Sequence, residues 1–333
     1  MASHPHRIAR LTPIIACTAL LANCASVPRS SAGALADAGI AVTNAFARDV
    51  RETSAHIREI DALDAFTATY AICSNPRLEC RSQLKSGPNY EARQELAKVI
   101  ELRAVAINGL RAAYSALKTE ADYDARVDLV GATNGAIDGV NNFAGAVGAL
   151  GGAASGAALI TAPLQKIVGF GAGLLADRAQ RKRLLHGSHG LAEATQRFHD
   201  ALAVEAFVFD SLAGYIEGNR TSAKLTLLDA GLASNQEIIQ AFSTGLGMKP
   251  IAAVDPVIAK SPAAKAAVRA IVEAQSRAEI DRIRAKYRAA LEALEALVKS
   301  HQDLEAEQPM SLSDVNRFLA ELDAAIEPST EEK

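Results

Sequence analysis

Three histidines near the middle of the chain have a residue type and a spacing that could bind a metal ion. His186 and His189 lie three residues apart, and His199 follows ten residues after His189. They would surround a metal only if the glycine-flanked break HGSHG at residues 186–190 folded the chain back on itself. A zinc site usually has three or four protein ligands, and neither a His-Glu-x-x-His motif nor a cysteine accompanies these histidines. We therefore interpret them as part of a solvated turn, and we predict no bound metal and no cofactor.

Motifs for covalent or nucleotide chemistry are absent from the sequence. It contains neither G-x-S-x-G nor a P-loop, and the glycine run that begins at Gly169 has Leu174 where a dinucleotide-binding loop requires its last glycine. Lys and Arg number 35 against 38 Asp and Glu, so the net charge of -3 offers no basic excess to a phosphate backbone. We predict that the protein is not an enzyme and does not bind nucleic acid.

The first 26 residues, MASHPHRIARLTPIIACTALLANCAS, have the layout of a secretion signal. Arg7 and Arg10 provide a cationic start, and residues 11–22 form an uncharged apolar run. That run is too short to span the roughly 30 Å hydrocarbon layer of a membrane. It therefore predicts export across a membrane rather than a transmembrane helix.

The end of this run, Leu21-Ala22-Asn23-Cys24, resembles the lipobox of bacterial lipoproteins. The resemblance implies cleavage before Cys24, a diacylglyceryl thioether on its sulfur and a further acyl chain on the freed amine. Two or more acyl chains anchor a protein stably to a membrane. Ala25 follows the cysteine in place of the Asp that retains such proteins in the inner membrane, so the resemblance implies the periplasmic face of the outer membrane. The alternative is ordinary signal-peptidase cleavage after Ser26, which would release a soluble periplasmic protein.

Cys73 and Cys80 are the cysteines that remain if residues 1–23 are removed and Cys24 is lipidated. In the oxidising periplasm that the lipobox implies, we expect these two cysteines to pair. Six residues separate them, and closing so short a loop contributes about 2 to 3 kcal/mol in the chain-entropy model. A redox function would favour the tighter Cys-x-x-Cys spacing. The spacing therefore favours a structural disulfide.

Composition and periodicity both predict an all-α fold. Apolar residues make up 49% of the 333 positions and aromatic residues only 5%, and the abundant residues are strong helix formers. Apolar side chains recur mostly at spacings of three and four, as on one face of a helix. This pattern predicts an elongated bundle of long antiparallel helices with a Gly/Ala-rich central hairpin. In the first helix it places Asp49 and Glu52 on the outer, solvated face.

The predicted helices cover residues 31–72, 90–118, 123–176, 191–217, 221–244, 262–307 and 311–325. Residues 31–118, in particular ARQELAKVIELRAVAINGLRAAYSALK, are also similar to alanine-rich helical lipoproteins of unassigned function in proteobacteria. That similarity implies location and architecture only. The domain organisation that we predict is a signal peptide at 1–23, a lipidated linker at 24–32, a helical bundle at 33–248, a proline-containing linker at 249–262, two C-terminal helices at 263–326 and a mobile tail at 327–333.

The central segment of the bundle, residues 131–176, is rich in glycine and alanine. Eleven of the 22 glycines fall within it, and residues 139–165 carry no charge. Small residues repeated every four positions let two helix backbones approach closely. Two such rows are present, Gly131, Gly135 and Gly139 in the first and Gly148, Gly152 and Gly156 in the second.

This segment has two interpretations. A helix of 27 residues would reach about 40 Å, enough to cross a bilayer, and the layout resembles that of α-helical pore-forming toxins. The favoured interpretation is a hairpin buried in the bundle, because Ala, Gly, Ser and Asn gain little from hydrocarbon. We therefore predict a non-enzymatic lipoprotein that serves as a structural or interaction module in the periplasm, with an envelope protein or a second copy as its partner. The alternative is a membrane-inserting protein that uses residues 139–176.

Overall fold

The computed structural model describes residues 12–81, 90–122, 128–151, 164–167, 176–234, 238–239, 243–244, 247 and 261–326. These residues contain no β-strand, so the predicted all-α fold is confirmed. The long helices are α1 (Thr12–Cys73), α2 (Tyr90–Ala121), α3 (Leu129–Gly151), α4 (Ala176–Asp229) and α7 (Pro262–Glu305), and a short helix α8 (Ser313–Ile326) follows them. Of the predicted linker at 249–262 only Ser261 and Pro262 are described, and the predicted tail at 327–333 lies outside the described residues.

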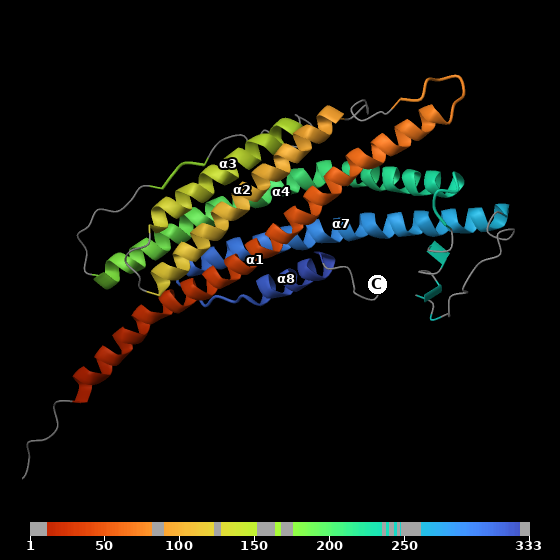
Figure 1. Ribbon diagram of the computed structural model, residues 1–333. Helices are drawn as coiled ribbons and strands as arrows, with labels where there is room; N and C mark the ends of the chain where they lie inside the picture. The colour runs from red at the N-terminus through yellow and green to blue at the C-terminus, as the bar shows by residue number, and fades with distance from the viewer. Residues whose placement is uncertain are drawn as a thin grey trace, which may run out of the picture.

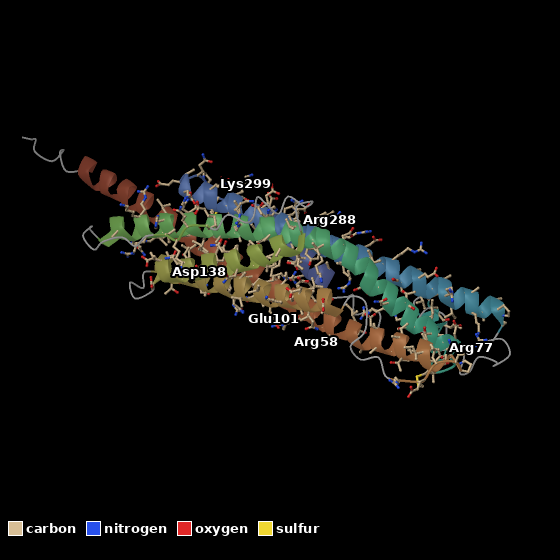
Figure 2. All side chains as sticks on the ribbon, turned by 90° about the horizontal axis from the view of Figure 1, so that it is seen from above. Arg58, Arg77, Glu101, Asp138, Arg288 and Lys299 are labelled. Carbon is tan, nitrogen blue, oxygen red and sulfur yellow. A yellow bond between two sulfur atoms is a disulfide. The ribbon has the colours of Figure 1, made fainter. Side chains whose placement is uncertain are left out.

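The helices form an elongated bundle in which α1 runs along the whole length (Figure 1). Helices α2 and α3 pack side by side, α4 packs against α3 and α7, and the short α8 lies against α7 and α1. Seen from above, the bundle keeps this long, narrow outline (Figure 2). Helix α1 also contacts α2, α4 and α7, and α4 contacts α2 as well, so α1 and α4 each touch four other helices.

The core consists of the apolar stripes that the periodicity predicts. On α1 the buried stripe residues include Leu35, Val42, Phe46, Val50, Ile57 and Ile60. The ring of Phe198 on α4 contacts Phe46 of α1 and Phe143 of α3, with centroids 5.7 and 5.4 Å away. This aromatic cluster joins three helices, and Phe143 is the residue of the Gly/Ala-rich segment that takes part in it.

Of the first glycine row, only Gly139 lies in a close contact between α2 and α3, since a Cβ at Gly135 would meet no atom within 4 Å and one at Gly131 would meet Asp128. A Cβ added at Gly139 would lie 3.2 Å from the Cα of Ala106, and one at Gly109 would lie 3.0 Å from the Cα of Ala136. Both distances are to backbone atoms, so the two helices approach as closely as the small residues allow. In the second row, Gly148 is partly buried near the end of α3, whereas Gly152 and Gly156 lie outside the described residues.

The predicted break at residues 186–190 is wrong, because α4 is continuous from Ala176 to Asp229. The glycines there serve packing. A Cβ at Gly187 would overlap the side chain of Leu129, and one at Gly190 would press on Thr133. Both contacts are with α3, so these glycines let α3 and α4 approach each other without ending the helix. The predicted break between residues 217 and 221 is also wrong, because both positions lie within the continuous helix α4.

The prediction of one helix over residues 123–176 is also wrong. Helix α3 ends at Gly151, and residues 164–167 form a non-helical segment that packs back on α3. Asn141 exchanges two hydrogen bonds with the backbone of Leu164, at 3.0 and 3.2 Å, and Asn134 does the same with Ile167, at 2.8 and 3.1 Å. Seven residues of helix rise about 10.5 Å, which matches three residues of extended chain at roughly 3.3 Å each. The distance between Asn134 and Asn141 along α3 therefore matches the distance between Leu164 and Ile167, whose backbone the two side chains bind.

The close contact between α2 and α3 predicts opposite effects for two leucine substitutions. Gly109→Leu places a side chain against the backbone of α3, so we expect the free energy of unfolding to fall by roughly 1 to 3 kcal/mol. Gly145→Leu on the exposed side of α3, where a Cβ would meet no atom within 4 Å, should be neutral or stabilising by up to about 1 kcal/mol, because glycine is a poor helix former. Urea unfolding followed by circular dichroism measures both. Equal effects would show that the glycine contact does not limit the packing.

Candidate functional site

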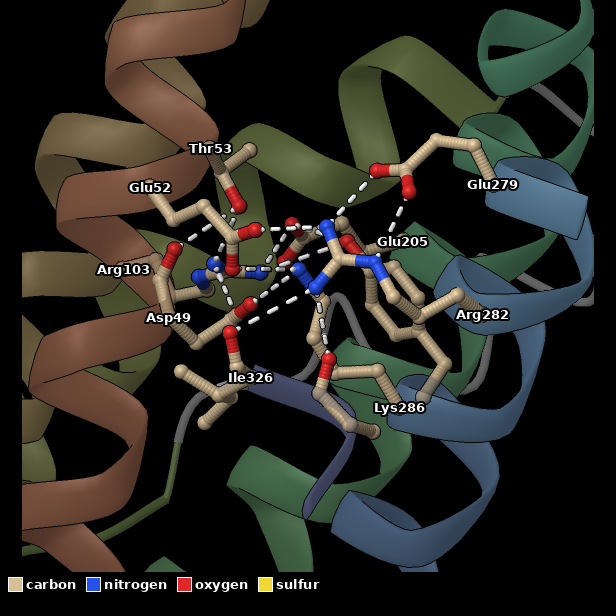
Figure 3. A network of polar contacts seen from close by, with 11 residues as sticks. Asp49, Glu52, Thr53, Arg103, Glu205, Glu279, Arg282, Lys286 and Ile326 are labelled. Carbon is tan, nitrogen blue, oxygen red and sulfur yellow. Dashed lines mark hydrogen bonds and ion pairs between the residues drawn. The ribbon is translucent and has the colours of Figure 1, made fainter. Parts of the chain in front are cut away.

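A network of charged side chains joins four helices in the middle of the bundle (Figure 3). Its centre is Arg103 of α2, which is only 1% exposed. The Nη2 atom of Arg103 donates to Asp49 of α1 at 2.6 Å, and its Nη1 atom donates to Glu205 of α4 at 2.7 Å. The hydroxyl of Tyr287 on α7 donates to the same Glu205 oxygen at 3.1 Å. One guanidinium therefore connects α1, α2 and α4, and Tyr287 connects α7 to them.

Two further cations on α7 extend the network toward the surface. Lys286 lies 2.6 Å from the second carboxylate oxygen of Asp49 and 3.4 Å from Glu52. Arg282 donates to Glu52 at 2.7 Å and to the carbonyl oxygen of Ala325 at 2.7 Å. Ala325 lies in the last turn of α8, where unpaired carbonyls favour a cation. The network thus also fixes the short C-terminal helix.

The two carboxylates beside Arg103 differ in their affinity for protons. Burial alone would raise the pKa of Asp49, but the charges of Arg103 and Lys286 outweigh burial and hold that pKa below its usual value. Burial raises the pKa of Glu205 above its usual value, because Arg103 offsets burial only in part and Asp49 repels a second negative charge. Asp49 therefore binds a proton less readily than Glu205 does.

The network has little room for a ligand. A cavity of about 10 Å³ lies between Asp49, Lys286 and Tyr287, and this volume holds roughly one water molecule. No substrate could reach Arg103 without separating the helices. The chemistry of this cluster is therefore the pairing of buried charges, which fixes how the helices fit together.

A second buried cluster lies nearer the end of α7. The Nε2 atom of His301 is 2.9 Å from the hydroxyl of Tyr114, and its Nδ1 atom is 2.8 Å from the hydroxyl of Ser188. The Tyr114 hydroxyl is also 2.9 Å from that of Thr195, and its ring fills the space that a side chain at Gly39 would occupy. Serine beside histidine is a nucleophile and base pair in some enzymes, but here both residues are fully buried. Burial lowers the pKa of His301 to about 3, so the ring is neutral in the folded protein.

The predicted disulfide is present. Cys73 at the end of α1 and Cys80 in the following loop are bonded, with their Cα atoms 4.4 Å apart. The bond lies at one end of the bundle, close to Arg77 (Figure 2). The predicted lipidation site, Cys24, belongs to α1, which continues as helix through the predicted linker at 24–32.

The three candidate histidines lie along the continuous helix α4 rather than in a turn. His189 is 3.2 Å from Glu305 and 3.5 Å from Glu193, and His199 is 3.0 Å from Asp200. In the part of the chain that the structure describes, no three metal-ligating side chains are grouped closely enough to hold an ion. The interpretation of residues 186–190 as a solvated turn was wrong, since the helix continues and Gly187 and Ser188 are buried.

Sequence reasoning missed the charged centre of the bundle. Asp49 was predicted to face solvent, and Arg103, Glu205 and His301 were not singled out. All four occupy stripe positions: Arg103, for example, is three residues after Ile100 and four before Ile107, both of which are buried. A charged residue in register with an apolar stripe was the available signal.

Comparison of this chain with protein-family models, with curated proteins and with solved structures found no match. Among the described helices, none combines the length and the hydropathy that crossing a membrane requires. Any statement of function therefore depends on the residues and the geometry of this chain.

The buried network predicts a large effect for Arg103→Leu. The substitution leaves Asp49 and Glu205 buried with one cation fewer, so we expect the free energy of unfolding to fall by about 3 to 5 kcal/mol. Arg58→Leu, at an exposed position on α1, should change it by no more than about 0.5 kcal/mol. Chemical unfolding of both variants measures the difference. A small effect at Arg103 would contradict the structural role of the network.

The buried imidazole predicts a specific dependence of stability on pH. The folded-state pKa of His301 is lowered from 6.5 to about 3, so the unfolded chain binds the proton first. The stability that His301 contributes is complete above about pH 6.5 and is lost as the pH falls toward 3, by up to about 1.4 kcal/mol per pH unit. His301→Gln should therefore destabilise the protein more at about pH 7 than at about pH 5. Equal destabilisation at the two pH values in urea unfolding would disprove this assignment.

Proposed function

We propose that the protein is a non-enzymatic lipoprotein, anchored by Cys24 to the periplasmic face of the outer membrane, which acts as a structural or interaction module. The observation that carries the proposal is the motif Leu21-Ala22-Asn23-Cys24 directly after a short apolar run. The Cys73–Cys80 disulfide supports it, because such bonds persist in oxidising compartments such as the periplasm.

The shape of the bundle suits a membrane-anchored spacer. The N-terminal part of α1 projects beyond the other helices, at the end of the bundle opposite to Cys73 (Figure 1). From Cys24 to Cys73 the helix rises about 70 Å at roughly 1.5 Å per residue. Lipid on Cys24 would therefore hold one end of the bundle at the membrane and could carry the disulfide end about that far into the periplasm.

The buried polar groups support a structural role rather than catalysis. Arg103, Asp49 and Glu205 form ion pairs with one another between helices. The His301 ring lies within hydrogen-bond distance of the hydroxyls of Tyr114 and Ser188. Catalytic side chains need access to a substrate, and these have none in the folded bundle. The enclosed geometry therefore fits a protein whose surface, rather than its interior, performs the function.

The membrane-inserting alternative requires the bundle to open. On α3, Val140, Phe143, Ala144 and Val147 are buried in the core, and Asn134 and Asn141 hold residues 164–167 on its surface. Insertion of residues 139–176 would remove these side chains from the core and break the four amide hydrogen bonds. We therefore base the proposed function on the lipid anchor alone.

The lipid anchor predicts different results for two cysteines in the same N-terminal segment. Cys24→Ala should abolish incorporation of radiolabelled palmitate and move the protein out of the detergent phase on partitioning, because only the thiol of the lipobox cysteine accepts diacylglycerol. Cys17→Ala, seven residues earlier in the apolar run, should leave both unchanged. Palmitate incorporation that survives Cys24→Ala would refute the anchor.

A further inference from the structure

Residues 164–167 form a short non-helical strap that lies against both α3 and α4. On the α3 side, the amides of Asn134 and Asn141 hold the backbone of the strap through four hydrogen bonds. On the α4 side, Gly190 leaves room for Ile167, because a Cβ at that glycine would lie 3.1 Å from the Cγ2 atom of Ile167. The strap therefore spans the boundary between the two helices.

The contacts that hold the strap are mostly ones that water can replace. Hydrogen bonds between neutral groups contribute little net stability, because the same groups bond to water when they separate. Lys166 of the strap pairs with Asp138 of α3 at 2.7 Å, but the two side chains are 59% and 51% exposed, and exposed ion pairs are weak.

The strap also buries little apolar surface. Leu164 and Ile167 are only half-buried, whereas Val140 and Phe143 of α3 are completely buried. Segments with few buried apolar contacts open locally, at a lower free energy than the whole fold. The strap can therefore leave α3 while the core of the bundle stays intact.

The strap forms one wall of a cleft between α4 and α7. Leu164 lines this cleft, together with residues of α4 that include His189 and Arg197 and residues of α7 that include Glu305. The cleft has a volume of about 410 Å³, and side chains of both charges line it. Ala192 and Arg197 are each 8% exposed, so little of either side chain is reached from solvent while the strap is in place.

We propose that the strap is a lid on this cleft. Asn134 and Asn141 hold the lid closed by its backbone, which leaves the side chain of Leu164 to form the cleft wall. When the amide hydrogen bonds break, Leu164 leaves that wall and Ala192 and Arg197 become accessible from solvent. The lid belongs to the bundle itself, so it operates whether or not the chain carries lipid.

Chemical labelling of a cysteine in the cleft tests the lid. The full-length protein carries Ala192→Cys, and its reaction with N-ethylmaleimide is followed by mass spectrometry of the peptide that contains residue 192, so that other thiols do not contribute. Adding Asn134→Ala and Asn141→Ala removes the four amide hydrogen bonds. We expect the labelling rate to rise at least roughly tenfold, since each lost bond accounts for a factor of about two to ten.

Asn108→Ala in the same Ala192→Cys background is the matched control. Asn108 is exposed on α2, and its side chain accepts a hydrogen bond from Arg111 at 2.8 Å. The same substitution thus removes a hydrogen bond without touching the strap, and we expect the labelling rate to stay unchanged. Equal rates in all three proteins, or equal increases from the two sets of asparagine substitutions, would overturn the proposal.

Hydrogen exchange of the wild-type protein distinguishes local opening of the strap from unfolding of the bundle. The backbone N–H groups of Leu164 and Ile167 donate to Asn141 and Asn134, so they exchange when the strap opens. We expect low concentrations of urea to leave their exchange rates unchanged, because local opening exposes little surface, and to accelerate exchange at Phe143. The same urea dependence at all three positions would overturn the proposal, because the strap would then open only together with the bundle.

Discussion

The burial of Arg103 between Asp49 and Glu205 is the constraint on which the packing of the bundle depends. Removing an ion from water costs several kcal/mol, and the cost is offset only when oppositely charged groups meet it with good geometry. Asp49 of α1 and Glu205 of α4 supply the two negative charges, and Lys286 of α7 supplies a second positive charge next to Asp49. A slip of one residue in any of these helices turns its side chain by about 100°. Apolar stripes alone constrain the register loosely, whereas the pairing of Arg103 with both Asp49 and Glu205 requires α1, α2 and α4 to keep their register.

Helix α3 contributes no charge to this network, and its position has a different origin. One side of α3 approaches the backbone of α2 at Gly139 and Ala136, where only small residues fit. Another side carries Asn134 and Asn141, whose amides bind an extended segment by its backbone. Backbone recognition places no demand on the side chains of that segment. At Gly139 and Ala136 the small residues therefore serve the close approach of two main chains.

Sequence periodicity was sufficient to predict the helical stripes, but not the exceptions to them. Stripe positions such as Leu35 and Phe46 are buried as expected, and the bond between Cys73 and Cys80, expected of the two cysteines left in an oxidising compartment, is present. The helical pattern groups Asp49 with neighbouring charged residues on the solvated face, but Asp49 is buried against Arg103, 54 residues away. Gly187 is equally compatible with a break and with close packing, and only the position of Leu129 on α3 decides between them. Long-range partners determine these cases, and local spacing can mark a charge that is in register with an apolar stripe but cannot identify its partner.

The charged centre and an apolar groove on the surface between α4 and α7 share one residue, which connects the rigidity of the core to the chemistry of the surface. The hydroxyl of Tyr287 is held by Glu205 inside the bundle, while the same residue lines the groove outside. Because Glu205 is itself fixed by Arg103, the groove has a wall whose position is set by buried ionic contacts. The buried charges that pair α1, α2 and α4 therefore also hold the ring of Tyr287 in place at the surface of α7.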